Sequence, residues 1–135
     1  MEIKELDPKW IKNEDGLPKE AVEYAETFAK KLVDLNEQNR PGFNALTTSK
    51  VRSFFGEIRR IQLKGFEKNK SAFNMLKPKL AYSVARERNK RSKIYDFQKV
   101  MNILIEQVTN ATEYNNFVSF IEATVAYHKA YGGKD

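Results

Sequence analysis

The sequence predicts an all-α protein: a single compact bundle of about five helices over residues 18–135, preceded by a loosely held N-terminal arm, residues 1–17. Three observations support this prediction. Apolar residues recur every three or four positions in five segments, which is the period of an amphipathic helix. No segment shows the alternation of a strand or the signal of a hairpin turn. A chain of 135 residues is long enough for one hydrophobic core and short for two.

The first predicted helix runs from about Pro18 to Leu35, after an arm that contains Pro8 and Gly16. Proline suits the first helical turn, because the N–H that it lacks would have no partner there. In the arm, Trp10 and Ile11 are candidates to anchor it to the body or to another subunit. The apolar face of this helix consists of Ala21, Tyr24, Ala25, Phe28, Leu32 and Leu35.

The second predicted helix follows a connection over residues 36–46. Thr47 or Thr48 would cap it, because a hydroxyl oxygen can accept a bond from a free backbone N–H of the first turn. Its apolar stripe is Val51, Phe54, Phe55, Ile58 and Ile61. The third predicted helix spans about Phe73 to Arg88, and we expect Pro78 to break or kink it.

The fourth and fifth predicted helices span about Ile94 to Val108 and about Tyr114 to Tyr131. Gly132 lies where a left-handed residue would end the fifth helix. His128 shares the inward face of that helix, which favours a packed histidine over a general base. The inward residues are Phe97, Val100, Met101, Leu104 and Val108 on the fourth helix, and Phe117, Phe120, Ile121, Thr124 and Tyr127 on the fifth.

Composition argues against several functional classes. The chain has no cysteine and one histidine, so we expect no disulfide, no metal site and no cofactor. It has no paired carboxylates, no nucleotide-binding loop and no serine-nucleophile motif, and we expect no enzymatic activity. The first ten residues lack the apolar region of a signal peptide, and no apolar run is long enough to cross a membrane. We expect a cytoplasmic protein without a membrane partner.

Basic residues are concentrated in the middle of the chain. Residues 38–99 hold sixteen Lys and Arg against four acidic residues, a net charge of +12. Residues 1–37 carry −4 and residues 100–135 carry −2, so the total of +6 hides this segregation. A local excess of this size indicates an anionic partner, most often a phosphate backbone. A solvated, lysine-rich surface fits the composition equally well.

The basic residues fall on helical stripes. A rotation of about 100° per residue places Lys79, Tyr82 and Arg86 together on the third predicted helix, and a longer helix would add Lys90 and Lys93. Such a stripe can follow a phosphate backbone while the aromatic ring stacks on a base or ribose. The alternative is a half-buried tyrosine among solvated cations.

The second predicted helix repeats this pattern. Arg52 and Arg59 share a stripe, with Gly56 between them. The missing Cβ of Gly56 lets another backbone approach closely, and a helix within the fold is as good a candidate as a ligand. Lys50 lies in the first turn, where its charge opposes the helix dipole, which indicates a ligand.

Three strings, in this order, resemble the small subunit of the type III-A CRISPR effector, the Csm complex: LTTSKVR (residues 46–52), LKPKLAYSVAR (76–86) and FIEATVAYHKAYGGKD (120–135). The resemblance implies a small helical protein without activity of its own, several copies of which stack along the effector and cradle target RNA paired to guide RNA. Its partners would be both RNAs, the other Csm subunits and further copies of itself. The implied RNA-binding residues are Lys50, Arg52, Arg59, Lys77, Lys79, Tyr82 and Arg86.

A subunit that serves any guide must not read base edges, so contacts to phosphates and 2′-hydroxyls should dominate. Stacked copies need complementary surfaces, and Glu20, Glu23 and Glu26 on the first predicted helix could meet the basic middle of the next copy. Two alternatives remain. One is a helix-turn-helix DNA-binding protein, in which Pro78 would disturb the recognition helix. The other is a helical scaffold that binds only protein.

Overall fold

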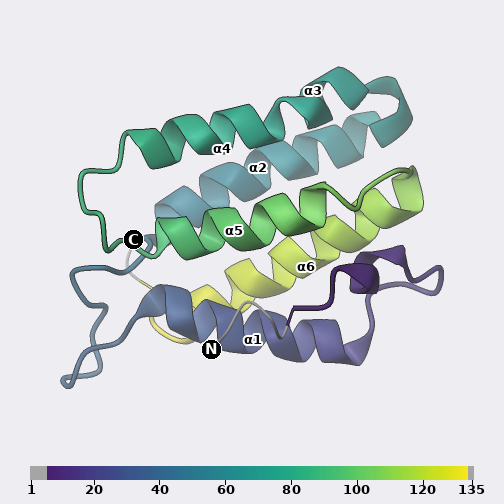
Figure 1. Cartoon of the computed structure of the whole chain (residues 1–135). Coiled ribbons are helices and arrows are strands. Elements are labelled where there is room, and N and C mark those ends of the chain that lie inside the picture. The colour runs from purple at the N-terminus through teal and green to yellow at the C-terminus, as the bar shows by residue number, and fades with distance from the viewer. Residues whose placement is uncertain (1–5, 134–135) are drawn as a thin grey trace.

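The apolar stripes form helices in the computed structural model, which describes residues 6–133 (Figure 1). No strand occurs within this range, so the all-α prediction is confirmed. The α-helices are α1 (Lys19–Val33), α2 (Thr48–Lys64), α3 (Lys70–Asn74), α4 (Leu76–Ala85), α5 (Ile94–Ile105) and α6 (Ala111–Ala130), with short 3-10 helices η2 (Pro8–Lys12) and η3 (Phe66–Lys68).

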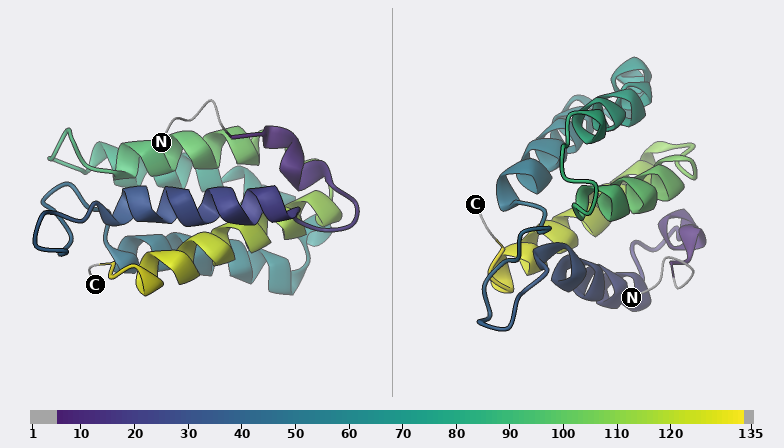
Figure 2. Two further views of the ribbon diagram at one scale, coloured as in Figure 1. Left: turned by 90° about the horizontal axis from the view of Figure 1, so that it is seen from below. Right: turned by 60° about the vertical axis from the view of Figure 1, so that its left-hand side comes forward.

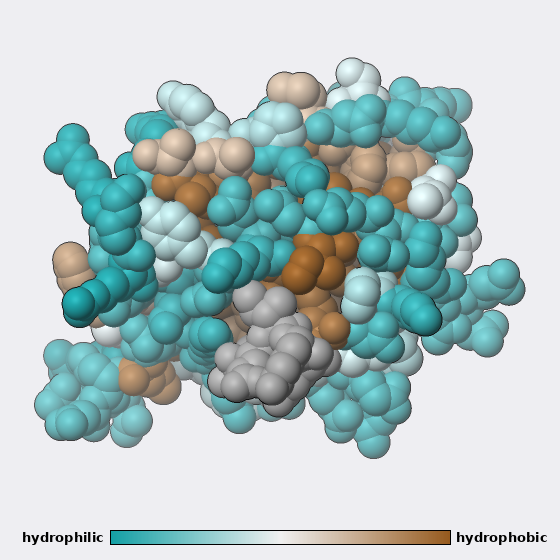
Figure 3. All heavy atoms as spheres, in the orientation of Figure 1, coloured by the Kyte–Doolittle hydropathy of each residue, from teal (hydrophilic) through white to brown (hydrophobic). Residues whose placement is uncertain are grey.

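Helix α6 is the centre of the bundle and packs against both α1 and α2 (Figures 1 and 2). Helix α4 packs mainly on α5 and forms an outer layer. Aromatic side chains fill much of the core: the rings of Phe28 and Phe97 stack at 6.4 Å, and Phe54 meets Phe97 edge-on at 5.5 Å. Hydrophilic side chains cover most of the face seen in Figure 3, and patches of apolar residues show between them. No helix in the described range is long and apolar enough to span a membrane.

Local capping bonds fix the helix ends. The Thr47 hydroxyl accepts a bond from the backbone N–H of Lys50 at 3.3 Å, as predicted for the start of α2. Helix α6 begins three residues before the predicted Tyr114, because the Asn110 side chain caps it by accepting from the Glu113 N–H at 2.9 Å. Gly132 has a φ of 86°, which confirms the left-handed residue predicted after this helix.

The third predicted helix is interrupted, but the break lies at Met75 rather than at Pro78. Proline donates no N–H, and its ring crowds the carbonyl four residues earlier, here that of Asn74. The helix therefore stops before the proline, and Pro78 lies in the first turn of α4. Helix α4 also ends at Ala85, before the predicted Arg88. The longer helix that would have added Lys90 and Lys93 to the basic stripe does not form, because both residues lie in the loop before α5.

The described part of the N-terminal arm is held more firmly than the sequence indicated. The Ile11 side chain is fully buried, which confirms its predicted anchoring role. The Asn116 amide of α6 donates to the carbonyl oxygens of Ile11 and Asn13, both at 2.8 Å. Lys12 forms an ion pair with Glu113 at 3.2 Å. Residues 1–5 of the arm lie outside the described residues, and a separate arm ending at residue 17 stays a prediction.

Candidate nucleic-acid interface

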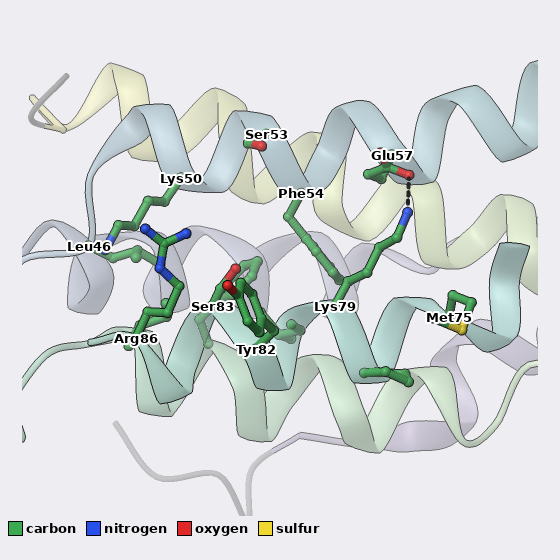
Figure 4. Close-up of a pocket in the computed structure, with 14 residues that line it drawn as sticks. Leu46, Lys50, Ser53, Phe54, Glu57, Met75, Lys79, Tyr82, Ser83 and Arg86 are labelled. Carbon is green, nitrogen blue, oxygen red and sulfur yellow. Dashed lines mark hydrogen bonds and ion pairs between the residues drawn. The ribbon is translucent and has the colours of Figure 1, made fainter. Parts of the chain in front are cut away.

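A groove of about 770 Å³ runs between α2 and α4. It forms because α4 packs mainly on α5 and leaves one side of α2 uncovered. Buried apolar side chains from α2, α4 and α5 line its base, and polar side chains line its edges (Figure 4). The lining residues are Leu46, Lys50, Ser53, Phe54, Glu57, Met75, Pro78, Lys79, Leu80, Tyr82, Ser83, Arg86, Ile94 and Phe97.

Helix α4 and its C-cap residue supply the predicted stripe of Lys79, Tyr82 and Arg86, and all three residues line the groove. The Tyr82 side chain is 65% exposed, which is unusual for a large aromatic residue. The Arg86 guanidinium lies over the Tyr82 ring, 5.6 Å from its centre. Figure 4 shows Lys79 reaching toward Glu57, and Arg86 extending toward the first turns of α2. This edge of the groove therefore combines two cations with an accessible aromatic ring.

Helix α2 supplies Lys50 and an acidic residue, Glu57, which forms an ion pair with Lys79 at 3.3 Å. A hydrogen bond from the Arg60 guanidinium lowers the pKa of the Glu57 carboxyl, and Lys79 lowers it further. At neutral pH the carboxylate is therefore ionised, and it holds the Lys79 ammonium at the groove edge.

Lys50 is held in a similar way from the end of α4. Its ammonium forms an ion pair with Glu87 at 3.1 Å. The backbone N–H of Asn89 lowers the pKa of the Glu87 carboxyl, and the Lys50 ammonium also lowers it. Arg86 differs from the two lysines, because it has no carboxylate partner within residues 6–133. Its guanidinium therefore remains available for an external anion.

The other three predicted RNA-binding residues lie elsewhere. Lys77 forms an ion pair at 2.9 Å with Glu106, the residue after α5, and does not line the groove. Arg52 and Arg59 lie on the exposed face of α2 opposite the groove, where Arg59 donates to the Gln62 side chain at 3.3 Å. Nothing lies within 4 Å of the place where a Cβ on Gly56 would stand, so the close internal helix contact considered for this glycine is absent.

Sequence reasoning missed the two acidic residues that position the lysines. A local signal existed for Glu57, because it follows Lys50 by seven residues and shares its stripe. No local signal exists for Glu87, whose partner Lys50 lies 37 positions away along the chain. Their contribution to the electrostatics of the groove depends on how α2 and α4 are placed by the fold.

The single histidine is part of the core, as predicted. His128 is fully buried, and its Nε2 lies 2.8 Å from the carbonyl oxygen of Leu46, so this nitrogen carries the proton. Its Nδ1 lies 3.0 Å from the Thr48 hydroxyl, from which it accepts. Burial lowers the pKa of the imidazole. Within the described residues, no group of His, Asp or Glu is arranged to hold a metal ion.

Comparison with known proteins places the chain in a family. A family model described as Csm2 Type III-A matches residues 16–134, which is most of the chain. Searches of curated proteins and of solved structures each found no match. The matched range contains all three strings described above, apart from the last residue of the third. The family therefore agrees with the resemblance found in those strings. The chain therefore belongs to the Csm2 type III-A family, the small subunit of the type III-A CRISPR (Csm) complex.

Proposed function

We propose that this chain is a non-catalytic RNA-binding subunit that holds the RNA backbone in the groove between α2 and α4. The observation that carries the proposal is the convergence of Lys50, Lys79 and Arg86 from two helices on one groove, with the exposed Tyr82 ring between the cations of α4. The net charge of +12 over residues 38–99, the segment that builds most of this groove, supports the same partner.

The chemistry of the groove favours binding without sequence preference. Ammonium and guanidinium groups donate to phosphate oxygens, which are identical for every nucleotide. A tyrosine ring stacks on any base or ribose, and its hydroxyl can bond a 2′-hydroxyl, which DNA lacks. A subunit of an effector that accepts any guide needs this kind of surface. Target RNA, guide RNA or the duplex of both would supply the backbone.

The two ion pairs at the groove prepare the lysines for this partner. Glu57 and Glu87 hold the ammonium groups in place, so that less side-chain entropy is lost when RNA binds. Both pairs are partly exposed, and each contributes little to folding stability on its own. A phosphate can therefore replace a carboxylate at either lysine at small cost.

The proposal is tested by the salt dependence of RNA binding. If four to six phosphates are contacted, the logarithm of affinity for single-stranded RNA should fall against the logarithm of salt with a slope of about −3 to −4. The double substitution Lys79→Gln and Arg86→Gln should flatten this slope by about 1.4, because it removes two phosphate contacts. Affinities of the purified full chain for RNAs of unrelated sequence, measured over a salt series, give the slope.

The matched control also removes two cations, but from positions outside the groove: Arg52→Gln on α2 and Lys77→Gln on α4. We expect it to leave the slope almost unchanged. An unaltered slope in the groove variant would remove these residues from the interface. Equal flattening in both variants would show that RNA does not distinguish the groove from the rest of the basic surface. Neither alternative, the helix-turn-helix protein or the pure protein scaffold, is favoured by a specific observation.

Self-association is the second part of the proposed function. The acidic face of α1 offers Glu20 and Glu23, both exposed, while Glu26 accepts a hydrogen bond from Tyr131 in the same chain. This face could meet the basic middle of a neighbouring copy, with charges of opposite sign across the contact. Several copies stacked in this way would repeat the groove along the RNA, and repetition raises the affinity of a weak individual site.

A further inference from the structure

Two loops meet at one end of the bundle, where α2 begins (Figure 1). One joins α1 to α2 and the other joins α4 to α5. They are tied together at Asn44, whose carbonyl oxygen accepts from the Lys93 N–H at 2.8 Å and whose side-chain oxygen accepts from Asn89 at 2.9 Å. Between the loops lies a hollow of about 200 Å³, lined by Gly42, Phe43, Ala45, Leu46, Thr47, Lys50, Glu87, Asn89 and Ser92.

Phe43 lines this hollow, and its side chain is 83% exposed. The backbone around it is fixed: the Gly42 N–H donates to the Asp34 carbonyl oxygen at 2.8 Å, and the Leu46 N–H donates to that of Leu32 at 3.0 Å. Gly42 is packed so closely that an added Cβ would lie 2.9 Å from the Asp34 carbonyl oxygen. The phenyl ring is therefore presented to solvent by an ordered loop, which lowers the entropy cost of binding a planar ligand.

The second loop, which is bonded to Asn44 next to Phe43, carries a high positive charge. Arg88, Lys90 and Arg91 are all exposed, and none has a carboxylate partner in the described part of the chain. Glu87, the acidic residue of the hollow, is neutralised by its ion pair with Lys50. An aromatic ring beside unpaired cations is the combination that binds unpaired nucleotides, through stacking on the base and ion pairing with the phosphates.

The hollow adjoins the groove, because Leu46 and Lys50 line both. A strand that follows Lys79 and Arg86 along the groove would pass Lys50 and reach Phe43. We propose that Phe43, with Arg88, Lys90 and Arg91, binds an unpaired nucleotide of the RNA that lies in the groove. We call these four residues the end-loop surface. The inference rests on the proposed function, to which it adds a base-stacking contact that is separate from the backbone contacts.

The test uses target RNAs that each carry a single 2-aminopurine, whose fluorescence reports stacking, bound to the assembled effector complex with Phe43→Ala in every copy. For at least one position, we expect the fluorescence to change at least about twofold relative to the complex with Phe43. Phe43→Tyr should restore the original signal, because it keeps the ring. Loss of one stacked base should weaken target binding about fivefold or more. The salt slope should stay unchanged, because no charge is removed.

The matched control is Leu63→Ala, which truncates another exposed apolar side chain, 75% exposed, on α2 outside both cavities. Leu63→Ala should change neither the 2-aminopurine fluorescence nor the affinity for the target RNA. If no 2-aminopurine position responds to Phe43→Ala, the inference is overturned, and the Lys79 and Arg86 experiment decides the proposed function independently. If Phe43→Ala lowers the number of copies in the complex, Phe43 contacts a protein subunit, and the inference is overturned as well.

Discussion

At the scale of single residues, one buried histidine joins two distant parts of the chain. His128 of α6 bonds the Leu46 carbonyl oxygen and the Thr48 hydroxyl, just where α2 begins. Gly133 packs directly against it: a Cβ on this glycine would lie 2.2 Å from the His128 Nδ1. The first turn of α2, which carries Lys50, is therefore positioned by the last turn of α6.

This contact predicts a pH dependence of stability. Burial lowers the pKa of His128 in the folded state below its ordinary value of 6.5. The unfolded chain then binds more protons than the folded chain at mildly acid pH, so the free energy of unfolding falls as pH drops below about 6.5. Urea unfolding at a series of pH values measures this free energy. The loss should be weaker in His128→Gln, and an identical pH profile in both proteins would contradict this assignment.

The titration of Glu57 and Glu87 does not obscure the pH dependence that comes from His128. The pKa values of Glu57 and Glu87 are lowered from 4.5, so their stabilising contribution is present above that pH and is lost only in more acid solution. The histidine contribution is lost at higher pH than theirs.

At the scale of elements, the positions and types of the helices were predictable, because the apolar stripes repeat locally over several turns. The ends were less predictable. Helix α6 starts early because Asn110 caps it, and the Met75 break precedes Pro78 because the proline acts on the carbonyl four residues earlier. The firm attachment of the arm had no local signal, since Asn116 reaches it across more than a hundred positions.

The attachment of the arm gives a prediction for this element. Asn116→Ala leaves the carbonyl oxygens of Ile11 and Asn13 without their buried donor, which should lower the free energy of unfolding by about 1–3 kcal/mol. Limited proteolysis should then cut faster within residues 6–17. The neighbouring exposed Asn115, which only accepts from the Gln62 side chain, supplies the control Asn115→Ala. Equal protection of the arm in all three proteins would show that these bonds do not hold it.

At the scale of the whole molecule, the sequence predicted the charge segregation and the stripe of Lys79, Tyr82 and Arg86, because both are local properties. It could not predict the groove, which depends on α4 packing mainly on α5. It also could not separate Lys77 and Arg52 from the groove-lining cations, since the choice of face depends on the neighbouring helices.

Stacking of copies gives a prediction at this scale. Glu20→Lys with Glu23→Lys should weaken self-association, because it replaces attraction to the basic middle of the next copy by repulsion. Sedimentation of the purified chain over a concentration series measures association, and circular dichroism should show unchanged helicity. As a control, Glu122→Lys reverses an exposed charge on α6. Unchanged assembly after the double reversal would remove α1 from the contact.

The central claim is that RNA lies in the groove between α2 and α4. Ultraviolet cross-linking of the assembled effector to its target RNA, followed by mass spectrometry of the attached peptides, tests it most directly. Tyr82 is the exposed aromatic residue of this groove, so we predict a cross-link on the α4 peptide that contains it, and its loss in Tyr82→Leu. Cross-links confined to α1 or α6, with none on α4, would contradict the account.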